Sequence, residues 1–271
     1  MANPLTSSSA ATGAGTREVR FAGLRFTLLD VDETVAALAR RAAEQPFVAF
    51  VTPNAEHAYL RRSDAEFRDC GDSCWISTND SRVLGRAARL AGIDLKFAPG
   101  AYVVDRLFRA GVIAPDDALT VVGATEEIVG QLRAQFGLTR VAQHIPPMGF
   151  IDKPEAVKAA IAFVAAHPAR FVFVAMGPPQ SEKFCQRVIA DGRATGIGLC
   201  IGSSLTVLTG NSQPAPDWME RSGLVWLYRL VKEPRRLWRR YLMRGLLGLG
   251  LGLRDAAAIR LGLRPGVTDA V

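Results

Sequence analysis

Short apolar segments of β-prone residues recur along the chain and alternate with helical patterns. The clearest segments are 47–51, 119–122, 171–174 and 198–201, and residues 74–77 are a further candidate. Each of the clearest segments is nearly uniformly apolar and is followed by a glycine or proline turn and then a helical pattern. Strands that are apolar on both faces and separated by helices belong to parallel sheets covered by helices on both sides. The sequence therefore predicts an α/β fold with a Rossmann-like, mostly parallel sheet.

The segments between these strands show amphipathic patterns typical of helices. We expect helices over residues 33–43, with Asp32 as the N-cap, and over 126–136, 153–166 and 181–190. These helices would supply the two layers that cover the sheet.

The sequence changes character near Pro214, Ala215 and Pro216. After this point come two helical stretches, 217–231 and 234–247, separated before Pro234 because proline suits the first turn of a new helix. The predicted organisation is a disordered tail over residues 1–17, an α/β domain over 18–212, a basic helical appendage over 213–247 and a flexible tail over 248–271.

Positive charge is concentrated in the appendage. The chain carries a net charge of +7 with a pI of about 9.6. Residues 217–244 hold eight basic and three acidic side chains, a surplus of five, interleaved with tryptophan and tyrosine. Aromatic rings beside cations suit the headgroup region of an anionic membrane, and the charge points to a polyanionic partner.

The second helix of the appendage is amphipathic when its residues are placed at 100° intervals. One predicted face is apolar and consists of Leu237, Trp238, Tyr241, Leu242 and Leu249. The other is basic and consists of Arg235, Arg236, Arg239, Arg240 and Arg244. This pattern predicts a helix that lies in a membrane interface, but a solvated basic helix packed on the core has the same periodicity, so that alternative stays open.

Several functional classes lose support. The cysteines, Cys70, Cys74, Cys185 and Cys200, lack CxxC spacing and no histidine clusters with them, so we expect reduced thiols and neither a metal nor a cofactor. His57 and His167 are interpreted as helix or cap residues, and His144 as structural or substrate-lining. No Walker A, GxSxG or HExxH motif occurs, and no GxGxxG lies between a strand and a helix. We expect neither a signal peptide nor a membrane-spanning segment.

Small and polar residues follow each predicted strand, at the edge where doubly wound folds bind their ligands. These clusters are residues 52–56, 78–82, 123–127, 177–182 and 202–204, and glycine turns and helix N-termini of this kind suit a diphosphate. Asp80 is the best candidate for a general base that deprotonates a hydroxyl group. The alternative is that Asp80 caps a helix over 81–91.

At this point the motifs resemble those of a known family. Residues 215–242 closely follow the signature of the bacterial WecG/TagA/CpsF glycosyltransferases, and the resemblance extends over about residues 21–244. Further matches are Thr52 and Asn54 of a TxN motif, the Gly149-Phe150 turn, Gly177, Pro179 and Glu182 of a GxPxQE motif, and Gly202 and Gly210. The family adds a sugar to a polyprenyl-diphosphate-linked saccharide.

The resemblance implies roles for particular residues. Asp80 aligns with the proposed base, and Arg229, Arg236 and Arg239 align with appendage arginines that engage the acceptor diphosphate. The donor nucleotide would lie over the strand ends, near Thr52, Asn54, Gly123, Gly177, Pro179, Gln180, Ser181, Glu182 and Gly202.

Four departures from the family pattern lie where a donor sugar would be recognised. Ser81 replaces a glycine after the base, Tyr102 replaces an aspartate, Ser181 replaces a glutamine, and Thr206 replaces an aspartate. They put the usual N-acetylmannosamine-type donor in doubt more than the reaction class. A non-catalytic homologue that binds nucleotide sugar or lipid stays open, as does, with less support, a basic nucleic-acid-binding module.

We therefore expect an inverting, metal-independent glycosyltransferase of cell-surface or exopolysaccharide biosynthesis. Its predicted partners are a nucleotide-sugar donor, a polyprenyl-diphosphate-linked acceptor and an anionic membrane surface, without nucleic acid and with a homo-oligomer left open. Its expected location is the cytoplasmic side of the cell membrane, as a peripheral protein.

Overall fold

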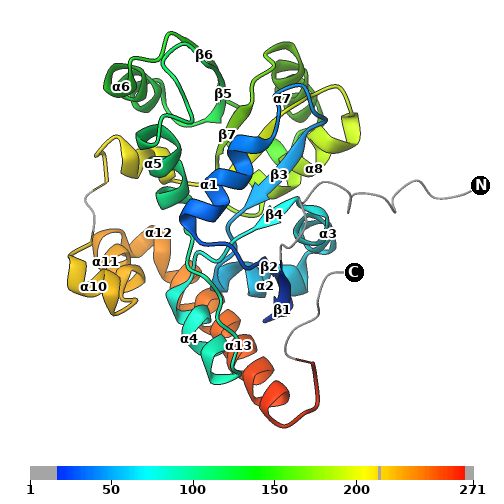
Figure 1. The fold of residues 1–271 in the computed structure, drawn as a ribbon, viewed down its shortest axis with the longest axis vertical. Helices are drawn as coiled ribbons and strands as arrows, with labels where there is room; N and C mark the ends of the chain where they lie inside the picture. The colour runs from blue at the N-terminus through cyan, green and yellow to red at the C-terminus, as the bar shows by residue number, and fades with distance from the viewer. Residues whose placement is uncertain (1–16, 213–214, 266–271) are drawn as a thin grey trace, which may run out of the picture.

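The computed structural model describes residues 17–212 and 215–265. Its centre is a six-stranded sheet in the order β4-β3-β8-β7-β5-β6, in which every neighbouring pair is parallel (Figure 1). The strands are β3 (Val48–Val51), β4 (Ile76–Ser77), β5 (Ala118–Gly123), β6 (Arg140–His144), β7 (Phe171–Ala175) and β8 (Ile197–Cys200). The predicted fold class is confirmed.

Helices cover both faces of the sheet, which is why its strands are apolar on both sides. In β7, Phe171 and Phe173 pack on one face and Val172 and Val174 on the other, and all four are buried. The first face is covered by α1 (Val31–Arg40), α5 (Gly100–Arg109), α6 (Glu126–Phe136) and α9 (Ser204–Leu208). The second is covered by α7 (Pro154–Ala166), α8 (Gln180–Asp191) and the short helix η1 (Phe150–Asp152), with α3 (Ala65–Ser73) beside α8.

The predicted N-cap of the first helix is wrong by two residues. Asp30 caps α1, since its carboxylate accepts a hydrogen bond from the Glu33 backbone N–H and Glu33 reaches back to the Asp30 N–H, each at 2.9 Å. This reciprocal capping box satisfies two backbone donors at once. Asp32 lies inside the first turn, where its carboxylate pairs with Arg106.

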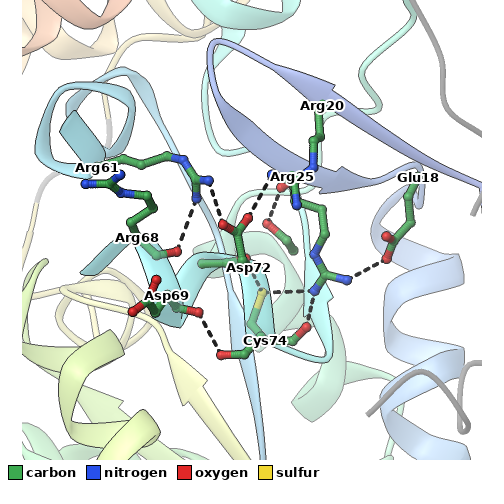
Figure 2. Close-up of polar contacts among 11 residues, drawn as sticks. Glu18, Arg20, Arg25, Arg61, Arg68, Asp69, Asp72 and Cys74 are labelled. Carbon is green, nitrogen blue, oxygen red and sulfur yellow. Dashed lines mark hydrogen bonds and ion pairs between the residues drawn. The ribbon is translucent and has the colours of Figure 1, made fainter. Parts of the chain in front are cut away.

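A small antiparallel hairpin, β1 (Glu18–Phe21) and β2 (Leu24–Thr27), lies beside the sheet and was not predicted. Figure 2 shows how its arginines bind the neighbouring elements. Arg20 pairs with Asp72 at 2.8 Å, and Arg25 pairs with Glu18 at 2.8 Å and contacts Cys74. The apolar side chains of the hairpin complete a third cluster with residues of α2 (Ala55–Ser63), α4 (Arg82–Leu90) and the last helix.

The C-terminal region forms more helices than expected. It contains α10 (Asp217–Arg221), α11 (Val225–Lys232), α12 (Pro234–Trp238), the π-helix η2 (Arg239–Gly245) and α13 (Leu246–Arg260), which gather at one end of the molecule (Figure 1). The break before Pro234 is confirmed, and a second break occurs at Gly223, whose φ is +72°. Residues 1–16 and 266–271 of the predicted tails and residues 213–214 of the predicted appendage lie outside the described residues.

The flexible tail predicted from residue 248 is wrong for residues 248–260, which belong to α13 and pack on α2 and α4. A stripe of small residues makes this close packing possible: Gly248, Gly252 and Ala256 are all buried. A Cβ atom on Gly248 would lie 1.7 Å from the carbonyl oxygen of Ala55, so only glycine fits there. Two of the glycines in this segment, Gly248 and Gly252, therefore serve helix packing. None of the helices among the described residues has the length and apolar character needed to cross a membrane.

Candidate functional site

A cleft of about 520 Å³ opens at the carboxyl ends of the central strands and is bounded on its other side by the appendage. The strand-end residues in its wall include Thr52, Asn54, Asp80, Gly177 and Gly202. The appendage contributes Arg229, Glu233, Arg236, Leu237, Arg240 and Tyr241. Segments more than a hundred residues apart in the sequence therefore form one site, as expected for the carboxyl edge of a doubly wound sheet.

Asp80 is half-buried in the cleft wall and does not cap α4. The cap is Ser81, whose hydroxyl accepts a hydrogen bond from the Leu84 N–H at 3.2 Å. The backbone N–H of Asp80 donates to the carbonyl of Pro53 at 3.0 Å, which joins the end of β4 to the loop after β3. The structure thus removes the capping alternative and leaves the Asp80 carboxylate facing the cleft.

Burial raises the pKa of Asp80 to about 6, because removal of water disfavours the charged carboxylate. The positive charges of Arg229, His57 and Arg240 and a hydrogen bond from Asn54 oppose this rise. A carboxylate in this range is mostly ionised at neutral pH and is more basic than an exposed aspartate, which suits general-base catalysis.

Six of the nine predicted donor-site residues line the cleft: Thr52, Asn54, Gly177, Ser181, Glu182 and Gly202. Gly123, Pro179 and Gln180 do not, and their neighbours Ala124 and Pro178 stand in the wall instead. At Gly123, where φ is +90°, a Cβ atom would lie 3.0 Å from the Ala175 carbonyl oxygen. Glycine is therefore required there for the close approach of β5 and β7.

Only two of the three predicted acceptor arginines line the cleft. Arg229 and Arg236 line the cleft, and Arg236 also pairs with Glu233 at 2.6 Å. Arg239 is exposed, outside the cleft, with its guanidinium 5.3 Å from the centre of the Trp238 ring. Arg240, which was placed on the basic face of the predicted amphipathic helix, also lines the cleft.

The predicted division of this helix into an apolar and a basic face is therefore wrong. Tyr241 lines the cleft from the face assigned to the membrane, whereas Trp238 and Leu242 of the same face are 43% and 44% exposed. The reason is that the cleft-lining side chains of this helix share one face at the usual three- and four-residue spacing, and this face takes members from both predicted faces: Arg236, Leu237, Arg240 and Tyr241.

Two arginines of η2 bind the body of the protein through one buried carboxylate. Glu56 in the first turn of α2 lies 2.7 Å from Arg240 and 3.2 Å from Arg244, and its side chain is only 6% exposed. A buried carboxylate requires such partners. These contacts fix the appendage over the cleft, and no local signal in the sequence indicates them because the partners are nearly two hundred residues apart.

His57 was interpreted as a helix or cap residue, and it does cap: its Nδ1 lies 3.3 Å from the Asn54 backbone N–H at the start of α2. Its other ring nitrogen, Nε2, lies 3.3 Å from the Glu182 carboxylate, and the ring lines the cleft. Sequence reasoning missed this second contact. The spacing of three between Asn54 and His57 signals the cap but not the distant partner.

Of the other residues singled out in the sequence, two line the cleft and two lie outside it. Tyr102 is 40% exposed and packs edge-on against Phe97, while Ala101 lines the cleft. Thr206 and Ser181 line the cleft at the positions of two departures. His144 is outside it and stacks on Phe163, and burial lowers its pKa.

All four cysteines are buried and free. Within the described ranges, no three His, Cys, Asp or Glu side chains group in a way that could hold a metal ion. The chemical groups of the cleft thus include the Asp80 carboxylate, three arginines, the Glu233 carboxylate paired with Arg236, a histidine–glutamate pair, a tyrosine and glycine turns.

The sequence also matches a known protein family. The model of the glycosyl transferase WecG/TagA/CpsF family matches residues 19–260, which include both the sheet and the appendage through the end of α13.

Proposed function

The chain belongs to the WecG/TagA/CpsF family of glycosyltransferases, and on that premise we propose that it moves a sugar from a nucleotide-sugar donor to a polyprenyl-diphosphate-linked saccharide. One observation supports this proposal most strongly: Asp80 lines the same cleft as Arg229, Arg236 and Arg240. A carboxylate beside several cations can activate a hydroxyl group while the cations hold phosphates.

In the proposed reaction, Asp80 accepts the proton of the acceptor hydroxyl. The freed oxygen attacks the anomeric carbon of the donor sugar from the face opposite the nucleotide. The bond from that carbon to the diphosphate oxygen breaks, so the configuration inverts and the nucleoside diphosphate leaves with the electron pair. Backbone N–H groups at the turns near Gly177 and Gly202 would stabilise its charge, and no metal is required by this scheme.

The appendage arginines would bind the diphosphate of the acceptor. Arg229 and Arg236 keep the role that the resemblance assigned to them, and the position of Arg240 in the cleft supports adding it. Arg239 is exposed beside Trp238, a placement better suited to a lipid headgroup.

We propose further that the appendage docks on the cytoplasmic face of the cell membrane. Apolar side chains on its outer surface support this: Trp238, Leu242, Met243, Leu246 and Leu247 are between 43% and 57% exposed. Each cation near an anionic membrane adds about 1 kcal/mol of binding energy. Apolar and ionic contacts together would allow reversible docking without a membrane-spanning helix.

The decisive experiment measures sugar transfer from a panel of nucleotide sugars to a short polyprenyl-diphosphate acceptor. Substitution Asp80→Asn should reduce transfer with the active donor about a hundredfold to ten-thousandfold, because the base is lost. Asp94→Asn removes an exposed carboxylate after α4 and should leave transfer unchanged. Near-normal transfer by a folded Asp80→Asn variant would refute the assigned base.

The same panel tests whether the departures from the family pattern change the donor or abolish transfer. These departures are Ser81, Tyr102, Ser181 and Thr206. If the wild-type chain binds a nucleotide sugar but transfers none, a non-catalytic role is favoured. If it transfers one, the panel identifies the donor.

A further inference from the structure

A second cavity of about 520 Å³ is bounded by α2, α3, α13 and the turn of the β1–β2 hairpin, and it shares no lining residue with the cleft that contains Asp80. We call it the arginine groove. The charged residues that line it are Arg61, Arg62, Arg68, Arg254, Asp255 and Arg264. Five positive charges against one negative charge leave a surplus of four.

Ion pairs within the protein account for only part of this charge. Arg61 pairs with Asp72 at 2.6 Å, and Arg264 pairs with Asp255. The three other arginines are exposed and form no ion pair within the described part of the chain: Arg62, Arg68 and Arg254. Because cations that converge without carboxylates repel one another, an anion bound among them lowers the energy of the groove.

One wall of the arginine groove is fixed by hydrogen bonds (Figure 2). Arg61 donates to the Asp72 carboxylate at 2.6 Å and to the backbone carbonyl of Arg68 at 3.1 Å, and its side chain is only 14% exposed. Asp72 also pairs with Arg20 of the hairpin at 2.8 Å, so two arginines share one carboxylate. These contacts join α2, α3 and the hairpin before any ligand binds, and such preorganisation favours binding.

The surface beside the arginine groove is apolar, and Arg254 lies at the boundary. Leu251 and Ala258, three residues before it and four residues after it, line the groove. Leu247 and Leu261, seven residues before it and seven after it, are 57% and 73% exposed. Positions seven apart lie on one side of a helix, so an exposed apolar strip runs along the groove. A ligand that covers both surfaces has an anionic head and an apolar tail.

We propose that the arginine groove binds the phosphate group of an anionic phospholipid, whose acyl chains lie along the outer face of α13. Arg62, Arg68 and Arg254 donate hydrogen bonds to the phosphate oxygens, and Leu247 and Leu261 contact the acyl region. This inference rests on the membrane docking proposed above and adds a defined lipid site to it. It does not involve sugar transfer.

The test measures binding of dihexanoyl phosphatidylglycerol, kept below its micelle concentration, to the full chain by titration calorimetry. The wild type should bind this lipid saturably, with a single site per chain. A variant that combines Arg62→Gln, Arg68→Gln and Arg254→Gln should bind it about tenfold to a hundredfold more weakly, because each arginine contributes to the attraction of the phosphate.

A matched control removes the same number of charges elsewhere. Arg40→Gln, Arg109→Gln and Arg140→Gln change exposed residues of α1, α5 and the start of β6 that line neither the groove nor the cleft. The affinity of this variant should stay within about threefold of the wild type, because distant exposed charges are screened by salt. Thermal unfolding establishes that the variants are folded. Arg254→Gln alone, which should weaken binding about fivefold, is the milder change if the triple variant does not fold.

Competing anions identify the source of the phosphate. Inorganic phosphate and a short DNA duplex, each at the concentration of the lipid, should displace little of it, since neither covers the apolar strip. Equal displacement by inorganic phosphate would show that the groove binds free phosphate. Displacement by DNA would show a nucleic-acid surface. Either result overturns the proposal.

An unchanged affinity in the folded groove variants would also overturn it. The variant with Leu242→Ser and Leu246→Ser should still bind the monomeric lipid, because both residues lie outside the arginine groove. Loss of monomer binding in that variant would place the lipid on the appendage instead. Failure of the groove is therefore distinguishable from failure of the docking surface, which binding to vesicles measures.

Discussion

At the scale of single residues, Asp80 opposes folding at neutral pH. Its pKa in the folded chain is about 6, above the value of 3.8 for an unperturbed aspartate. The unfolded chain therefore loses this proton at lower pH than the folded chain. The stability that protonated Asp80 contributes is fully present below the unfolded value of 3.8. The free energy of unfolding falls by this contribution as the pH rises through about 6.

Substitution Asp80→Asn should consequently stabilise the protein at pH 7, by up to about 3 kcal/mol for a shift of about two pKa units. Near pH 3 the difference from the wild type should largely vanish, because Asp80 is then mostly protonated in both the folded and the unfolded chain. Urea unfolding at the two pH values measures this. A variant less stable than the wild type at pH 7 would show that the carboxylate helps to hold the fold.

Residue roles were predictable from the sequence only where a local signal existed. Asp80, Thr52 and Asn54 directly follow strands, and their place at one edge follows from a parallel sheet. Glu56 and His57 face partners at positions 240, 244 and 182, and nothing in a single sequence indicates such pairs. Arg240 was grouped with the outer arginines because helical periodicity separates charged from apolar residues but does not show which side of the helix meets the body of the protein.

At the scale of elements, the packing of α13 depends on the absence of side chains at particular glycines. Gly248→Ala should destabilise the protein by several kcal/mol or displace α13, because the new Cβ would meet the backbone of Ala55. Gly250 lies on the same helix, and a Cβ atom there would have no neighbouring atom within 4 Å, so Gly250→Ala should be neutral or stabilising by up to about 1 kcal/mol. Thermal unfolding of both variants compares them, and equal effects would contradict the packing role.

The ion pairs of Glu56 should hold η2 against α2. Substitution Glu56→Gln leaves Arg240 and Arg244 without their carboxylate, and we expect a loss of about 1 to 3 kcal/mol and faster hydrogen exchange over residues 239–245. Glu233→Gln, which removes the partner of the exposed Arg236, should cost less than about 1 kcal/mol. Unaltered exchange in η2 would show that other contacts fix the appendage.

The elements themselves could be predicted to different degrees. Five of the six strands of the sheet and the helices named from the sequence were found to within a few residues, because burial on both faces leaves a plain apolar pattern. The edge strand β6, whose residues are of mixed polarity, was not predicted, nor were the helices α2, α3, α5 and α9. The hairpin of β1 and β2 was missed, since its strands, with sequences EVRF and LRFT, contain no continuous apolar run. The continuation of α13 beyond residue 247 was missed because glycine is a poor helix former, and tertiary packing overrides that propensity here.

At the scale of the whole molecule, the exposed apolar residues of the appendage are the basis of the proposed docking. Together, Leu242→Ser and Leu246→Ser should weaken binding to phosphatidylglycerol vesicles about tenfold or more, since each removes apolar area from the bilayer contact. Met148→Ser changes a residue that is 91% exposed on the loop after β6, outside the appendage, and should have no effect. Vesicle co-sedimentation measures both, and equal binding by all variants would exclude this surface.

The π-helix η2 has a consequence for how this protein tolerates insertions and deletions. A π-helix accommodates one extra residue by widening its turn, so removing one residue from 239–245 would let the segment relax to ordinary α-helical geometry and leave α13 close to its present rotation. The small-residue stripe of α13 would then still face Ala55 and Leu84, whereas the loss of one residue from a regular α-helix turns everything after it by about 100°. The wide turn thus gives this segment room to lose one residue while the helix that follows keeps its glycines against the body of the protein.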